Sequence, residues 1–128
     1  MRKSIQVICV DDDRETGSLL SRILELVGIK VSVNCRSAEE LLEKMNTSQF
    51  QEARIFIIDV QLPKMSGVEL ATRLRSSGEN RPIIMASGFS KDDRWGLKEM
   101  RVDFIQKPYD FNELQCMIQS LVQEPVIA

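Results

Sequence analysis

The sequence predicts an α/β domain built on a five-stranded parallel sheet with five helices. Short apolar runs alternate with amphipathic stretches along the chain, which gives five strand–helix units in series. The run Ile55–Ile58 is apolar at consecutive positions, which is typical of a strand buried on both faces in the middle of a parallel sheet. Strands that alternate with helices imply a parallel sheet covered by helices on both faces, and each crossover is expected to be right-handed.

The strands are predicted from short apolar or alternating runs that are bounded by polar residues. Lys30–Asn34 qualifies by the alternation of Val31 and Val33, and the strand that starts at Pro82 has its proline at the first residue, where it is tolerated. The expected strands, in order, are Ile5–Val10, Lys30–Asn34, Ile55–Ile58, Pro82–Ala86 and Asp103–Gln106.

The helices are predicted from apolar periodicity and from capping residues. Ser37 with Glu40, and Ser66 with Glu69, form capping-box patterns that begin the second and third helices, and a fourth helix is expected over residues 90–100. The first helix has an apolar stripe and ends at a glycine: Leu19, Leu20, Ile23, Leu26, Val27, then Gly28. The last is capped by Asp110 and Glu113 and has the stripe Leu114, Met117, Ile118, Leu121 and Val122.

Length and composition place the chain among ordinary globular domains. Its 128 residues suit one domain, expected over residues 1–124, with residues 125–128 as a tail or the start of a linker. A net charge of −2 gives no electrostatic case for nucleic acid binding. No apolar run reaches the roughly 20 residues that a membrane span needs, and Ile5–Val10 is too short for a signal-peptide core. A cytoplasmic protein is therefore expected.

The three cysteines, Cys9, Cys35 and Cys116, are far apart and form no Cys-x-x-Cys pair. The chain has no histidine, which argues against a zinc site. We therefore expect reduced thiols that act as small apolar side chains.

Polar side chains follow four of the five predicted strands. Asp11, Asp12 and Asp13 follow the first strand, Asp59 the third, Ser87 the fourth and Lys107 the fifth. In an open parallel sheet, function gathers at the carboxyl ends of the strands, near the point where the strand order reverses. Carboxylates, a hydroxyl and an ammonium group are therefore expected to converge on one edge.

This set of groups suits phosphoryl transfer. Hard oxygen ligands suit Mg²⁺, which usually takes one or two protein carboxylates and completes its shell with water and phosphate. One carboxylate can act as a nucleophile and form an aspartyl phosphate. Lys107 and the metal would then neutralise charge on the transferred group.

Four motifs in this order and spacing resemble the receiver domain of response regulators in two-component signalling. The motifs are Ile5–Asp12, Asp59–Gly67, Pro82–Gly88 and Phe104–Pro108. The resemblance extends from about Ile5 to Val122. It implies a doubly wound, flavodoxin-like sheet with strand order 2-1-3-4-5, and a phosphorylation-controlled switch that catalyses its own phosphotransfer and dephosphorylation.

The resemblance also assigns roles to individual residues. Asp59 matches the phosphoacceptor, and Asp11, Asp12 and the Gln61 backbone carbonyl match the groups that hold Mg²⁺ together with Asp59. Ser87 and Lys107 match the residues that contact the phosphoryl group. The remaining matches are Phe104 as an aromatic switch and Pro108 as a proline often preceded by a cis bond.

The implied partners are a sensor histidine kinase or phosphotransfer protein as donor, and an output protein or fused output domain. A homodimer is possible, and neither direct nucleic acid binding nor a membrane is expected.

Two other functions are open to the same residues. Asp11-x-Asp13 superficially fits a phosphatase of the haloacid dehalogenase type, although Glu15 stands where Thr or Val is expected and no later acidic pair is present. A pseudo-receiver that only binds partners is the third hypothesis, and the intact acidic, hydroxyl and lysine set argues against it. Asp13 itself is expected to be a solvated residue at a helix N-terminus.

The chain departs from the family pattern at two places. Ser66 stands where many receivers have Asp, and the stretch from Ser87 to Lys107 is about two residues shorter than usual, by a rough alignment. The fourth helix, which carries Trp95, is therefore expected to be short or shifted.

Overall fold

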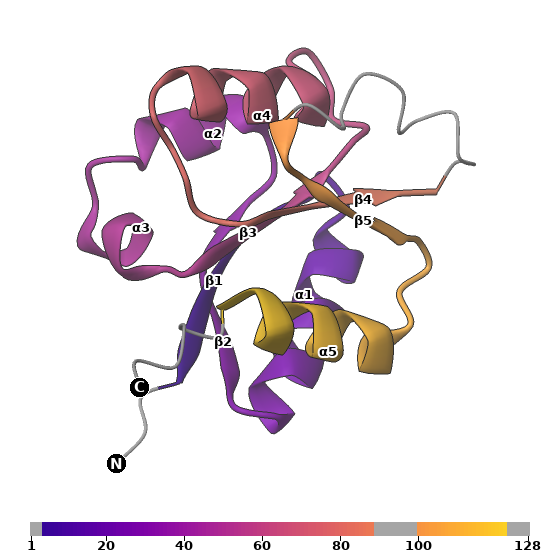
Figure 1. Ribbon diagram of the computed structural model, residues 1–128. Helices are drawn as coiled ribbons and strands as arrows, with labels where there is room; N and C mark the ends of the chain where they lie inside the picture. Colours follow the sequence, from indigo (N-terminus) through magenta and orange to yellow (C-terminus); the bar gives the residue numbers. More distant parts are fainter. Residues whose placement is uncertain (1–3, 89–99, 123–128) are drawn as a thin grey trace.

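A five-stranded parallel sheet forms the centre of the computed structural model, which describes residues 4–88 and 100–122 (Figure 1). The strand order is β2-β1-β3-β4-β5, as predicted. The chain therefore starts near the middle of the sheet, turns to one edge at β2, and crosses back to build the other half. The strands are β1 (Ile5–Val10), β2 (Ile29–Cys35), β3 (Ile55–Asp59), β4 (Ile83–Ser87) and β5 (Asp103–Gln106).

Helices cover both faces of the sheet, which makes the fold doubly wound. The face with α1 (Arg14–Leu26) and α5 (Phe111–Val122) lies opposite the face with α2 (Ala38–Glu43), α3 (Ser48–Glu52) and α4 (Gly67–Ser76) (Figure 1). Each face has its own apolar cluster of buried side chains. No helix in the described ranges is both long and apolar enough to span a bilayer.

Strand periodicity divides the apolar side chains between the two clusters. In β1, Val7 and Cys9 pack on the α1–α5 side, whereas Ile8 and Val10 pack on the opposite side. All of β3 is buried, which confirms the interpretation of the run Ile55–Ile58. Burial of one such side chain contributes about 1.5–3 kcal/mol, so the central strands fix the register of the sheet.

The helix N-termini have the capping residues expected from the sequence. The Ser37 Oγ accepts the Glu40 amide at 3.0 Å, and the Ser66 Oγ accepts the Glu69 amide at 3.1 Å. Glu40 also reaches back, but it accepts the amide of Arg36 at 2.9 Å, one residue before the cap. Each side chain thus satisfies an amide that has no partner within its helix.

The helices of the described ranges differ from the predicted set in two places. The short α3 was not predicted; it begins after the N-cap Thr47 and buries Phe50. The helix predicted over residues 90–100, with Trp95, lies outside the described residues except for its last position. The strand boundaries differ slightly from the predicted ones: β2 extends by one residue at each end, and Pro82 precedes β4 instead of starting it.

The apolar stripe predicted for α1 was partly wrong. Leu20 and Leu24 are its buried leucines, whereas Leu19, Leu26 and Val27 are 51%, 85% and 40% exposed. The stripe that meets the sheet runs through i and i+4 positions, and several leucines beside it turn toward solvent. The α1 helix therefore has apolar side chains on its outer side as well.

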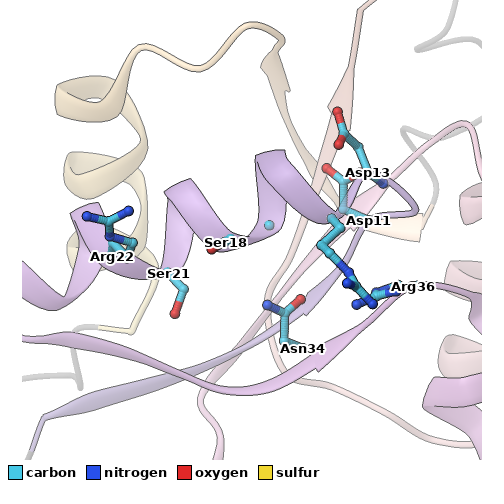
Figure 2. A pocket seen from close by; sticks show the side chains of 9 residues that line it. Asp11, Asp13, Ser18, Ser21, Arg22, Asn34 and Arg36 are labelled. Carbon is cyan, nitrogen blue, oxygen red and sulfur yellow. Dashed lines mark hydrogen bonds between the residues drawn. The ribbon is translucent and has the colours of Figure 1, made fainter.

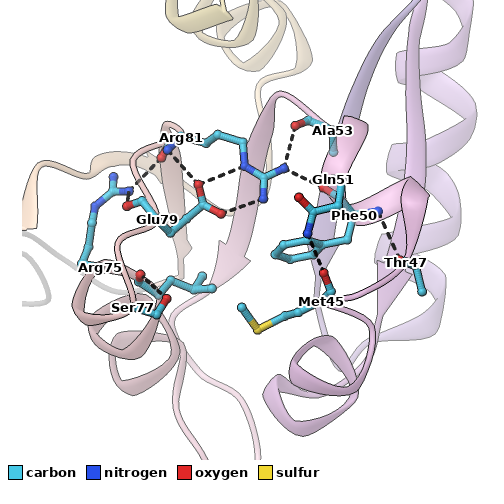
Figure 3. Close-up of polar contacts among 10 residues, drawn as sticks. Met45, Thr47, Phe50, Gln51, Ala53, Arg75, Ser77, Glu79 and Arg81 are labelled. Atoms are coloured by element: carbon cyan, nitrogen blue, oxygen red, sulfur yellow. Dashed lines mark hydrogen bonds and ion pairs between the residues drawn. The ribbon is translucent and has the colours of Figure 1, made fainter.

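An arginine ties α3 to the start of β4. The Arg81 guanidinium donates to the carbonyl oxygens of Phe50 at 2.6 Å and Ala53 at 2.8 Å, and it forms an ion pair with Glu79 at 2.6 Å (Figure 3). It also lies over the rings of Phe50 and Phe56, 4.7 and 4.9 Å from their centroids. A hydrogen-bonded, partly buried charge of this kind holds the otherwise marginal five-residue α3 in place.

Candidate functional site

Backbone hydrogen bonds continue past the strand ends and position the polar residues that follow. The Asp11 amide donates to the Cys35 carbonyl at 2.9 Å, and the Lys107 amide donates to the Ser87 carbonyl at 2.8 Å. The Lys107–Pro108 peptide bond is cis. The predicted residues therefore meet at the carboxyl edge of the sheet, where β1 and β3 lie side by side at the reversal of strand order.

Three carboxylates lie close together at this edge. One oxygen from each of Asp11, Asp12 and Asp59 lies within 4.8 Å of the others. Asp11 is 2% exposed and Asp59 8% exposed, whereas Asp12 faces solvent. Two of the three acids are therefore held in a poorly hydrated place, where their repulsion must be balanced by a cation.

The Lys107 ammonium supplies part of that balance. Its Nζ donates to the Asp11 Oδ2 at 2.7 Å and to the Asp59 Oδ2 at 3.0 Å. Burial disfavours the charged amine, but the hydrogen bonds to both carboxylates prevail and raise the pKa of Lys107 above its ordinary value. Lys107 is therefore charged at neutral pH and bridges the two buried acids.

Asp59 has a partner on each oxygen. Its Oδ1 accepts the Gln61 amide at 3.0 Å, and its Oδ2 accepts the Lys107 ammonium. Burial raises the pKa of Asp59, and the hydrogen bonds from Lys107 and Gln61 counter part of that rise. The carboxylate is thus fixed in orientation and incompletely neutralised.

Gly67 allows the first turn of α4 to close against the strand end. A Cβ atom built on Gly67 would lie 2.0 Å from the Asp59 carbonyl oxygen and 2.9 Å from the Val60 Cα. The Gly67 amide donates to the Val60 carbonyl at 2.9 Å. The sequence places this glycine in the turn before the helix, but the close approach to Asp59 depends on a contact that spacing alone does not reveal.

Ser87 and Phe104 lie on neighbouring strands. Ser87 is 4% exposed at the end of β4, and Phe104 pairs in register with Met85, two residues earlier on that strand. Phe104 is half-buried and packs with the apolar cluster beneath α2 and α4. Since side chains two residues apart along a strand share a face, Phe104 and Ser87 are on the same side of the sheet.

Asp13 is outside the carboxylate cluster. It is the exposed N-cap of α1, where its carboxylate accepts the Glu15 amide at 3.0 Å and the Thr16 hydroxyl at 2.8 Å. These bonds lower its pKa, with the Thr16 hydroxyl as the largest cause. The expected role of Asp13 at a helix N-terminus is confirmed. Asp13, the second acid of the phosphatase-type pattern Asp11-x-Asp13, therefore serves as a helix cap.

Cys9 and Cys35 are free and buried, as expected, whereas Cys116 is free but exposed. Burial raises the pKa of the Cys9 thiol to about 12 and that of Cys35 to about 11, so neither is an available thiolate at neutral pH.

Comparison with known proteins decides the family. The sequence matches the model of the response regulator receiver domain over residues 7–119. This chain belongs to the response regulator receiver domain family.

The receiver domain has curated relatives among transcriptional regulatory proteins. It is 32% identical to CpxR of Escherichia coli (strain K12) over 120 residues, which cover 92% of this chain and 49% of that protein. The CpxR homolog of Haemophilus influenzae is also 32% identical, over 92% of this chain and 50% of that protein. The chain thus spans about half the length of the curated relatives it matches.

Solved structures agree with the fold. A CheY-like receiver domain from Methylobacillus flagellatus matches with a TM-score of 0.79 and 26% identity, covering 92% of this chain and 98% of the other. The receiver domain of the Francisella response regulator 1452 matches with a TM-score of 0.82 at 24% identity, over 93% and 97% of the two chains. The second likeness supports the fold alone.

Proposed function

We propose that this receiver domain takes a phosphoryl group onto the Asp59 carboxylate from a phosphohistidine of a sensor histidine kinase or phosphotransfer protein. The observation that carries the proposal is the setting of Asp59. It ends the fully buried β3, its two oxygens are held by the Gln61 amide and the Lys107 ammonium, and two further carboxylates lie beside it. A fixed, incompletely neutralised carboxylate is suited to act as a nucleophile.

The transfer forms one bond and breaks another. An oxygen of Asp59 attacks the phosphorus, and the phosphorus–nitrogen bond of the donor breaks with its electron pair leaving on the imidazole. Lys107, already 3.0 Å from the Asp59 Oδ2, can donate to a phosphoryl oxygen as charge moves onto it. Later attack of water on the same phosphorus releases inorganic phosphate and restores the carboxylate.

The carboxylate cluster fits a divalent cation. Three carboxylates and one ammonium leave two net negative charges in a space where the acid oxygens lie within 4.8 Å of one another. Asp11, Asp12, Asp59 and the Gln61 backbone carbonyl would hold Mg²⁺, whose preferred ligands are hard oxygens. When bound, Mg²⁺ supplies positive charge that stabilises the transferring phosphoryl group.

The output follows from the charge that phosphorylation adds, about −1.5 to −2 at one position. Ser87 lies at the edge where its hydroxyl can bond the phosphoryl group, and Phe104 lies on the same face of the neighbouring strand. We infer that Phe104 changes position with Ser87 and alters the surface of β5 and α5. This surface would bind an output protein, a fused output domain or a second copy of the chain.

The test is phosphorylation by acetyl phosphate with Mg²⁺, read by intact mass and by mapping of the modified residue. Asp59→Asn should abolish the modification. Asp13→Asn is the matched control, because it makes the same chemical change at an exposed cap on the same edge, and it should be modified as the wild type is. Modification of Asp11, or normal modification of Asp59→Asn, would contradict the proposal and favour a phosphatase-type nucleophile.

The output inference has its own measurement. Chemical shifts with a phosphoryl mimic and Mg²⁺ should change at Phe104 and Tyr109 as well as around Asp59. Changes confined to the loop after Asp59 would leave the domain a phosphoryl relay without this output surface.

A further inference from the structure

A polar groove lies between α1 and the edge strand β2, beside the proposed phosphoacceptor site, with which it shares only Asp11. Its volume is about 310 Å³. One wall comes from α1 and the other from β2 and the residue after it, and Asp11 and Asp13 close one end. The polar groups that line the walls are Arg14, Ser18, Ser21, Arg22, Asn34 and Arg36. Figure 2 labels all of these except Arg14.

Among the residues that the structure describes, the three arginines of the groove have no anionic partner of their own. Within residues 4–88 and 100–122, the guanidinium groups of Arg14, Arg22 and Arg36 form no ion pair and no side-chain hydrogen bond. The carboxylate near Arg36 is that of Glu40, and its two oxygens already accept the Arg36 amide and the Lys44 ammonium. The lining of the groove therefore carries three arginines against the two carboxylates of Asp11 and Asp13.

Among the described residues, the acids at the end of the groove form no ion pair with these arginines. The Asp11 carboxylate accepts the Lys107 ammonium at 2.7 Å and the Asp13 amide at 2.9 Å. The Asp13 carboxylate is engaged by the Glu15 amide and the Thr16 hydroxyl. Asp11 is thus paired with Lys107, whereas Asp13 keeps its charge, so the lining has a small positive excess and its guanidinium groups have no direct bond to either acid.

Gly17 keeps the floor of the groove open. It is buried, and a Cβ atom there would lie 3.3 Å from the Asn34 Oδ1. The missing side chain lets the Asn34 amide lie against the helix, and Figure 2 shows Asn34 directed from β2 toward α1 while Ser21 is directed from α1 toward β2. Neutral hydrogen-bonding groups thus face each other between the charged ones.

We propose that this groove binds a small phosphate-bearing molecule. Guanidinium groups match the oxygens of phosphate with paired, charge-assisted hydrogen bonds, and here they come from both walls. The volume is at the lower end of the range of small-molecule sites. An acidic protein surface fits less well, because the guanidinium groups come from both walls of a groove rather than from one flat face, an arrangement that suits a small ligand lying between them.

The experiment is a titration of the full chain with inorganic phosphate, without divalent cations, at ionic strength held constant with potassium chloride. Amide and arginine side-chain NMR signals report the position of binding. Saturable shifts are expected at Gly17, Asn34 and Arg36. Arg14→Gln and Arg36→Gln should each weaken binding about tenfold, the scale of one charge-assisted hydrogen bond.

The matched control is Arg73→Gln, which removes the same charge from an exposed position on α4 and should leave phosphate affinity unchanged. Equal weakening by Arg73→Gln, or linear shifts without saturation, would reduce the effect to general charge screening and overturn the proposal. Shifts confined to the residues after Asp59 and around Lys107 would place phosphate in the phosphoacceptor site instead. A polyglutamate peptide that binds these arginines more tightly than phosphate would replace the small molecule with an acidic protein partner.

Discussion

Gly67→Ala tests whether Asp59, the proposed phosphoacceptor, depends on the close approach of α4. The added Cβ would lie 2.0 Å from the Asp59 carbonyl oxygen, 2.8 Å from its carbonyl carbon and 2.9 Å from the Val60 Cα. Real Cβ contacts are essentially never shorter than 3.0 Å, so the two backbones must separate by about 1 Å. Both sides of the contact are backbone, and no side-chain rotation can relieve it.

The displacement has two expected consequences. Overpacking of this kind costs about 1–3 kcal/mol, and here it also stretches the hydrogen bond from the Gly67 amide to the Val60 carbonyl. Asp59 begins the same loop, and a misplacement of about 1 Å can slow a reaction about 100-fold. The variant should therefore be less stable and much slower in phosphorylation.

The assay pairs urea unfolding with the initial rate of phosphorylation by acetyl phosphate and Mg²⁺. Gly17→Ala is the control, because its Cβ would meet only the end of the exposed Asn34 side chain at 3.3 Å, which can move aside. Alanine is favoured over glycine inside a helix, so this control should be neutral or slightly stabilising and should keep the rate. A Gly67→Ala variant with wild-type stability and rate would refute the reasoning.

Three further predictions concern stability, measured by urea unfolding. Arg101→Gly should stabilise by a few tenths to about 1 kcal/mol, because φ of 55° strains a non-glycine residue while the bond from the Arg75 guanidinium to the residue 101 carbonyl is kept; a loss would contradict this. Arg81→Met should cost about 2–4 kcal/mol, because it strips the Phe50 and Ala53 carbonyls of their donor, and a cost below about 1 kcal/mol would show the clamp to be dispensable. Burial raises the pKa of Asp59 above its unfolded value of 3.8, so the native state loses stability as pH rises from about 3.8 through the native pKa. Without divalent cations, Asp59→Asn should therefore be more stable than wild type at pH 7, by a margin that shrinks toward about pH 4. A margin that does not change with pH would contradict this.

The strand order and the gathering of Asp11, Asp59 and Lys107 were predictable because they depend on patterns that are visible in the sequence itself. Strand identity comes from runs of apolar residues, and the residue after each strand of a parallel sheet reaches the same edge whatever the loops do. Chain order with right-handed crossovers then limits the topologies. The family resemblance supplied the strand order itself.

Other features depend on contacts that no local pattern encodes. The short α3 has a single buried side chain, Phe50, so no helical period could indicate it. Its position depends on Arg81, which lies 31 positions later in the sequence. In α1, Leu19 and Leu24 are equally plausible core residues from composition, and only the packing of the helix on the sheet decides that Leu24 is buried.

Lys107 contacts both the buried carboxylates and the neighbouring strand β4. Lys107 bonds Asp11 at 2.7 Å and Asp59 at 3.0 Å through its side chain, and it bonds the Ser87 carbonyl at 2.8 Å through its backbone. Phosphorylation of Asp59, as proposed, would add negative charge on one side of the ammonium and draw its hydrogen bonds away from Asp11. Because the backbone of Lys107 is hydrogen-bonded to β4, this change in hydrogen bonding must be accommodated by movement of the Lys107 side chain and of the groups around it. Ser87 lies at the end of β4. Phe104, on β5, pairs with Met85, two residues before Ser87, and shares its face of the sheet, so a movement of Ser87 can displace Phe104 and with it β5.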